Sequence, residues 1–127
     1  MSAERTYTRE FAAYAALDPL LDQVIQSQSE YWAPEVPPPT VLFGALGRSV
    51  VEHWADLSQE RRKTVFRKVE IDMDPGDEDF STVIATGFIE AIVNPFPVDD
   101  PLWIEIQTYM GKQTIDYAHA WIAFWEG

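Results

Sequence analysis

The apolar residues between positions 40 and 56 recur at four-residue intervals, and this spacing limits the fold more than any other feature. Leu42, Leu46, Val50 and Trp54 follow one another in this way, which places them along one face of an α-helix. Equivalent spacing predicts further helices over residues 8–17, 19–31, 59–73, 79–93, a short stretch from Pro101, and 113–126. No segment shows a convincing two-residue alternation. The sequence therefore predicts an all-α protein of six to seven helices in antiparallel hairpins, with some likeness to an α-solenoid.

Proline-rich connectors separate these helices. Residues 33–39 contain four prolines, which remove backbone donors and hold the chain extended, and residues 94–101 form a second connector. Helix ends are also marked by N-caps at Asp18, Ser58, Asp100 and either Asp77 or Asp79, and by Gly111 as the predicted C-terminal glycine of the helix that begins at Pro101. A chain of 127 residues suits one domain, 1–127.

Two glycines interrupt the helix over 40–56. Gly44 and Gly47 each lower intrinsic helix stability by about 1 kcal/mol relative to alanine. We therefore expect them to serve a packing role, in which a second helix approaches closely.

The net charge of −12 is unevenly distributed along the sequence. Residues 1–68 carry nine acids and eight bases, whereas residues 69–127 carry twelve acids and one base, Lys112. Such a chain should repel nucleic acids and anionic membranes and attract a basic protein.

The chain has no cysteine, no apolar core for a signal peptide in its first ten residues, and no apolar run of about 20 residues. We expect a soluble cytoplasmic protein.

Half of those later acids lie in one short segment. Residues 70–80, EIDMDPGDEDF, contain Glu70, Asp72, Asp74, Asp77, Glu78 and Asp79. Counted from either Asp72 or Glu70, the segment lacks the glycine at position six and the glutamate at position twelve that an EF-hand requires. A polar loop also lacks the apolar setting that raises the pKa of a catalytic carboxyl. The segment is therefore predicted to be neither a metal site nor a catalytic site.

Two interpretations of the segment remain. Asp77, Glu78 and Asp79 lie where a helix begins, and acids there interact favourably with the helix dipole. Glu70, Asp72 and Asp74 lie near the end of the preceding helix, where the same dipole disfavours them. One interpretation is a solvated turn; the other is a surface for a basic partner, which would explain the unfavourable half.

The chain shows no pattern typical of an enzyme. Its two histidines, His53 and His119, each neighbour a tryptophan on an apolar helix and are interpreted as partly buried structural residues. Neither belongs to a zinc-ligand pattern, and residues 43–49 lack the lysine and spacing of a phosphate-binding loop. No cofactor and no metal is predicted.

Aromatic residues gather near the end of the sequence. They are Trp103, Tyr109, Trp121, Phe124 and Trp125. We interpret them as core, with contact between one or two of them and a partner as the alternative. Trp32, beside the first proline-rich connector, is the best candidate for partial exposure.

Two segments of the second half resemble a known family. TGFIEAI (86–92) carries a Gly-Phe-aliphatic-Glu motif, and MGKQTIDYAHAWIAFWEG (110–127) is a terminal helix with aromatic positions, opened by Met110-Gly111. Together they resemble a family of small acidic, helical bacterial proteins that is often linked with polymorphic toxin loci. This chain has Lys112 where such proteins commonly have proline. The resemblance implies an immunity protein, which binds a toxin domain and neutralises it.

The sequence thus predicts a protein that binds a cognate, basic toxin domain and occludes its active or substrate-binding surface. The predicted partner-binding residues are Glu70, Asp72, Asp74, Asp77, Glu78 and Asp79, with Asp99, Asp100 and Trp32 secondary. The alternative is a helical adaptor or oligomerisation module that binds through an apolar face; whether the chain self-associates stays open. A small enzyme or ligand-binding protein with a pocket at His53 or His119 is the third hypothesis.

Overall fold

The computed structural model describes residues 5–126, and every regular element in that range is helical. The order is α1 (Thr8–Ala15), α2 (Pro19–Trp32), α3 (Pro39–Glu52), the short 3-10 turn η1 (Trp54–Asp56), α4 (Gln59–Asp72), α5 (Glu78–Val83), the π-helical segment η2 (Ile84–Ile89), α6 (Glu90–Val93), α7 (Pro101–Gln107) and α8 (Lys112–Glu126). The all-α prediction is confirmed. None of the helices in residues 5–126 is long and apolar enough to cross a bilayer.

The capping residues begin the helices where the sequence predicts. The side chain of Asp18 accepts a hydrogen bond from the Leu20 amide at 2.8 Å, and that of Asp100 accepts one from the Leu102 amide at 2.8 Å. Ser58 caps α4 in the same way. Of the two candidates for α5, Asp77 is the cap. Each side chain satisfies a backbone donor that the helix itself leaves free.

The predicted role of Gly111 is wrong. α7 ends at Gln107, and Gly111 lies directly before α8 without a positive φ. Its missing side chain serves a different purpose, because a Cβ at this position would overlap the carboxyl group of Glu70. Gly111 therefore makes room for a residue of α4.

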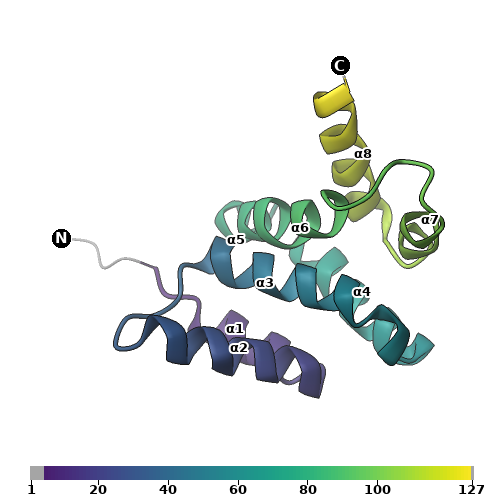
Figure 1. Cartoon of the computed structure of the whole chain (residues 1–127). Coiled ribbons are helices and arrows are strands. Elements are labelled where there is room, and N and C mark those ends of the chain that lie inside the picture. The colour runs from purple at the N-terminus through teal and green to yellow at the C-terminus, as the bar shows by residue number, and fades with distance from the viewer. Residues whose placement is uncertain (1–4, 127) are drawn as a thin grey trace.

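α3 is the central helix, and it packs against α2 on one side and against the α5–η2–α6 rod on the other (Figure 1). The rod was predicted as a regular helix, but its middle is the π-helical segment η2. A Cβ on Gly47 would lie 2.6 Å from the Phe88 carbonyl oxygen, and one on Gly87 would lie 2.9 Å from the Thr40 carbonyl oxygen. The predicted close approach is confirmed for Gly47. Gly44 has ordinary space, 3.4 Å from the Arg48 guanidinium.

The core forms around aromatic contacts between distant helices. Phe43 of α3 is fully buried, and its ring lies 4.8 Å from that of Tyr14 and 5.6 Å from that of Phe80. α8 joins this core through Thr114 and Ala118, which are buried, and through Trp121 and Ile122, which are partly buried against it. Figure 1 shows the rest of α8 rising away from the other helices. Its last turns are therefore left without a packing partner on much of their surface.

Candidate functional site

The acidic segment 70–80 is tied into the fold at its first residue. The half-buried carboxylate of Glu70 accepts hydrogen bonds from the amides of Gln113 and Thr114, both at 2.9 Å, and from the Thr114 hydroxyl at 2.8 Å. These donors are at the N-terminus of α8, where a negative charge is favourable. Glu70 thus lies in the last turn of α4, where the dipole of α4 disfavours an acid as predicted, and its carboxylate also caps the start of α8, where a negative charge is favourable.

The next two acids also have partners within the chain. Asp72 accepts hydrogen bonds from the Tyr14 hydroxyl at 2.8 Å and from the Lys68 ammonium at 3.2 Å. Burial, reinforced by the charge of Asp72, raises the pKa of Tyr14 well above its usual range. Asp74 accepts a hydrogen bond from the Gly76 amide at 2.7 Å and so fixes the turn. Asp72 and Asp74 thus have hydrogen-bond partners within the chain, and their contact with an outside partner stays a prediction.

Asp77 has two roles in the same turn. It caps α5 through the Phe80 amide, at 3.2 Å, and it pairs with both guanidinium nitrogens of Arg5, at 2.8 Å each. The Arg5 hydrogen bonds, together with the Phe80 amide, lower the pKa of Asp77 to about 2. Residue 77 therefore holds the start of α5 to the segment before α1.

The remaining predicted acids differ in their exposure and in their contacts with the rest of the chain. Glu78 and Asp79 lie exposed in the first turn of α5, and no hydrogen bond or ion pair joins their carboxylates to the rest of residues 5–126. Asp99 is exposed in the second connector, whereas Asp100 is half-buried and occupied as the cap of α7. Three of the predicted acids, Glu78, Asp79 and Asp99, are thus available to a partner without any cost to the fold.

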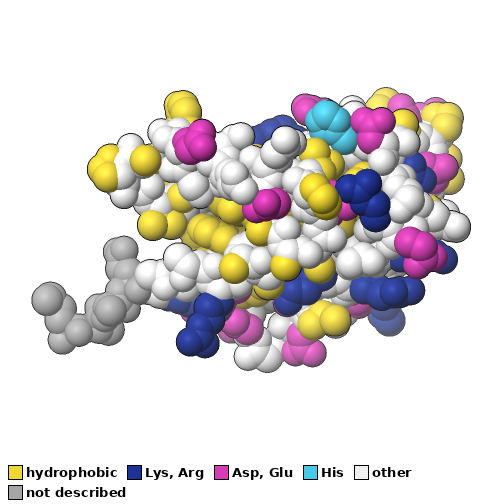
Figure 2. All heavy atoms as spheres, turned by 90° about the horizontal axis from the view of Figure 1, so that it is seen from below, with side chains coloured by type: hydrophobic (Ala, Val, Ile, Leu, Met, Phe, Trp, Pro, Cys, Tyr) yellow, Lys and Arg dark blue, Asp and Glu magenta, His cyan; other side chains and the backbone are white. Residues whose placement is uncertain are grey.

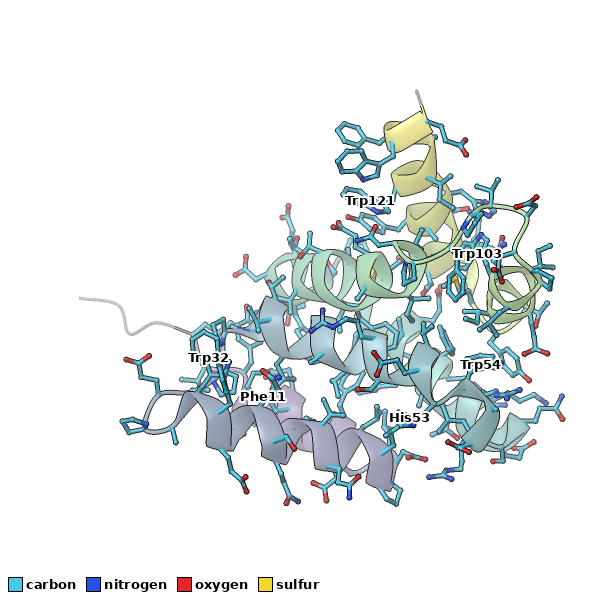
Figure 3. All side chains as sticks on the ribbon, viewed as in Figure 1. Phe11, Trp32, His53, Trp54, Trp103 and Trp121 are labelled. Carbon is cyan, nitrogen blue, oxygen red and sulfur yellow. The ribbon has the colours of Figure 1, made fainter. Side chains whose placement is uncertain are left out.

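Trp32 is half-buried, so the prediction of partial exposure is confirmed. Its ring packs edge-on against Tyr31, which is 81% exposed. Its indole nitrogen is buried and has no hydrogen-bond partner within residues 5–126. The ring lies near Phe11 at one end of the α1–α2 hairpin (Figure 3).

The face of the molecule that Figure 2 presents is not uniformly acidic. Ion pairs join the two halves of the chain, among them Arg5 with Asp77 and Arg62 with Glu105. Figure 2 shows Lys and Arg side chains next to Asp and Glu side chains over the face that it presents. Charge alone therefore does not locate an interface, and a second property is needed.

The end of α8 carries such a property. Trp121, Phe124 and Trp125, here called the aromatic ledge, pack against each other with ring centroids 5.6–6.0 Å apart. Phe124 is 72% exposed and Trp125 is 69% exposed. Trp121 donates its indole hydrogen to the Asn94 side chain at 2.8 Å and faces the α5–η2–α6 rod (Figure 3). The interpretation of these aromatic residues as core is correct for Trp103 and wrong for Phe124 and Trp125.

Two grooves flank the ledge. The larger, of about 420 Å³, lies between the end of α8 and the second connector, and it is lined by Val93, Asn94, Phe96, Pro97, Val98, Trp121, Ile122, Trp125 and Glu126. The smaller, of about 240 Å³, shares Val98, Ile122 and Glu126 with it. Neither groove is lined by a lysine or an arginine. The larger groove is lined mainly by apolar side chains, whereas the smaller one also has Gln107, His119 and Glu126 in its wall.

Each of the two histidines lines a groove: His53 lines one of about 400 Å³ between α2 and α3, and His119 lines the smaller groove beside the end of α8. Both histidines are exposed rather than partly buried as predicted; His53 directly follows α3, and His119 lies within α8. The His53 ring nitrogen lies 3.7 Å from the Asp56 carboxylate, and that of His119 lies 2.8 Å from the Gln107 amide oxygen. Within residues 5–126, no three His, Asp or Glu side chains converge closely enough to hold a metal ion.

The chain matches no protein-family model, no curated protein and no solved structure in the three comparisons made with known proteins. The resemblance to immunity proteins therefore stays a prediction.

Proposed function

We propose that this protein is an immunity-type inhibitor, which binds a basic bacterial toxin domain and covers the surface that the toxin uses on its own substrate. The observation that carries the proposal is the set of exposed carboxylates of Glu78, Asp79 and Asp99, which have no hydrogen-bond or ion-pair partner among residues 5–126, in a chain of net charge −12. Exposed charges of this kind accelerate association with an oppositely charged protein and select against partners of like charge.

The mechanism would be occlusion. Lysines and arginines that a toxin uses to hold an anionic substrate would pair with the carboxylates of this chain. Pairs that lose their water on binding form stronger hydrogen bonds than pairs that stay exposed. No chemical step by this chain is required.

The test begins with the gene directly upstream, which we expect to encode a secreted protein with a basic C-terminal domain, and continues with co-expression of that domain in bacterial cells. We expect growth to be rescued and a 1:1 complex to elute in size-exclusion chromatography with light scattering. Absence of both the rescue and the complex would contradict the proposal.

A charge-reversal pair locates the contact. The double variant Glu78→Lys with Asp79→Lys should slow association about tenfold at low salt and have a much smaller effect at high salt. The matched control, Glu52→Lys with Glu60→Lys, changes the net charge equally on exposed residues of α3 and α4. Equal effects of the two pairs would show that only total charge matters.

A helical adaptor is the second candidate, because exposed Phe124 and Trp125 favour apolar docking. Its binding would be almost independent of salt between 50 and 500 mM, whereas binding by the proposed inhibitor would weaken steadily over roughly that range.

A further inference from the structure

The aromatic ledge is not explained by the stability of the fold. Phe124 and Trp125 keep more than two thirds of their surface exposed, although each could contribute much apolar area to a core. Trp125 lines a groove of about 420 Å³, and the Phe124 ring packs against Trp125; a groove of this size is within the range of sites that hold a small ligand or a few side chains. Exposed tryptophan beside an apolar groove is typical of an interface anchor.

The surrounding charge limits what can occupy the groove. Glu126 belongs to both grooves, and Asp99 directly follows Val98, which also lines both. A second copy of this chain would bring the same acids and another net charge of −12 to the contact, which is unfavourable. A membrane surface or a nucleic acid would meet this region without any lysine or arginine lining it.

We infer that the two grooves hold a segment of a partner protein in which an apolar side chain enters the larger groove and an adjacent lysine or arginine meets Glu126 and Asp99. The inference rests on the proposed function in one respect, namely that the partner is basic. Trp125 and Phe124 would cover the apolar side chain and offer their ring faces to an arginine.

The aromatic ledge and the acids of α5 would contribute to binding in different ways. Exposed charges such as Glu78 and Asp79 govern the rate of encounter, whereas desolvated aromatic anchors govern the rate of dissociation. Removal of the ledge side chains should therefore raise the dissociation rate of the complex at any salt concentration.

Three peptides test the site directly on the ¹⁵N-labelled full chain. The probe is the capped hexapeptide Arg-Arg-Leu-Leu-Arg-Arg, with Glu-Glu-Leu-Leu-Glu-Glu and Arg-Arg-Gly-Gly-Arg-Arg as controls. We expect the probe to shift the indole N–H signals of Trp121 and Trp125 in a saturable way, with an affinity at least about fivefold higher than either control, equivalent to roughly 1 kcal/mol. Equal binding of all three peptides, or shifts confined to residues away from α8, would overturn the inference.

Variants of the ledge add a second measurement. Phe124→Ala with Trp125→Ala should remove at least about 80% of the shift at Trp121, equivalent to the same fivefold loss of affinity, while the rest of the spectrum stays folded. Tyr31→Ala removes an exposed aromatic ring from α2 and should leave the peptide bound. If the free chain is a dimer and Trp125→Ala converts it to a monomer, the groove holds a second copy of this chain, and the inference of a basic partner segment is wrong.

The partner domain separates the two proposals. If the upstream-encoded domain binds and its dissociation rate is unchanged by Trp125→Ala, the ledge inference is wrong and the proposed function stands. If the probe peptide binds at the ledge but the domain does not bind, the proposed function is wrong and the ledge remains a site for a basic, apolar segment.

Discussion

The acidic segment 70–80 and the end of α8 both look exceptional in the sequence, yet the structure uses them in opposite ways. Four of the six carboxylates of the segment accept hydrogen bonds from within the chain, from the first helix to the last. The aromatic ledge, in contrast, leaves two of its three rings more than two thirds exposed. A concentration of one residue type therefore does not mark an interface. The fold leaves two rings of the aromatic ledge mainly exposed, and for that reason we propose the interface there.

The first prediction concerns Glu70, where we expect the largest effect. Glu70→Ala removes three hydrogen bonds from the start of α8 and should lower the free energy of unfolding by about 2–3 kcal/mol. Chemical denaturation monitored by circular dichroism measures the loss. Since Gly111 makes room for this carboxyl group, Gly111→Ala should be costly in the wild type and nearly neutral in the Glu70→Ala background. Simple additivity of the two changes would show that the contact is not formed.

The second prediction concerns Tyr14, whose hydroxyl binds Asp72 from the interior. Tyr14→Phe keeps the buried ring and removes only the donor, so we expect a loss of about 1 kcal/mol, seen as a lower midpoint of denaturation. Tyr31→Phe, at an exposed ring, is the control and should change nothing. If Tyr14→Phe and Tyr31→Phe changed the midpoint of denaturation equally, the hydrogen bond from Tyr14 to Asp72 would not stabilise the fold.

The third prediction concerns pH. Because Arg5 lowers the pKa of Asp77 to about 2 from 3.8, the folded form releases this proton more readily than the unfolded form. The stabilisation is complete above about pH 4 and is lost as the pH falls toward 2. Asp77→Asn should lower the thermal midpoint at pH 6 by a small amount and have no effect near pH 2. Asp79→Asn, at an unpaired acid of the same helix turn, should match the wild type at both values. A loss at pH 2 as large as that at pH 6 would contradict the pairing.

The fourth prediction concerns the aromatic ledge, where we expect the smallest effect on the stability of the fold. Phe124→Ala with Trp125→Ala should change the free energy of unfolding by less than about 0.5 kcal/mol, because both rings are mainly exposed. The same denaturation experiment measures it. A decrease of 2 kcal/mol or more in the free energy of unfolding would show that the ledge is part of the core. The ledge would then stabilise the fold as the acidic segment 70–80 does.

Much of the fold follows from local sequence signals. Asp18, Ser58 and Asp100 begin helices where capping chemistry places them, because each cap depends on residues only two or three positions away. The role of Glu70 is not local: its partner Thr114 lies 44 residues further along the chain. The sequence therefore shows a carboxylate at the wrong end of α4 without showing that α8 begins beside it.

The ledge could be predicted only in part. Trp125 falls on the apolar stripe of its helix, so periodicity predicts burial. Periodicity does not reveal that α8 extends beyond the helices against which it packs. The exposure of Trp125 is a property of the assembled fold, as is the groove that runs beside it.

Hydrogen–deuterium exchange of the full chain, with and without the basic partner domain, is the most direct test of binding at the aromatic ledge. The account predicts a slower exchange in residues 94–100 and 119–126 when the domain is present, with a smaller change at the start of α5. No slowing anywhere would contradict the proposed binding function. Slowing confined to the α1–α2 hairpin would contradict the assignment of the interface to the aromatic ledge.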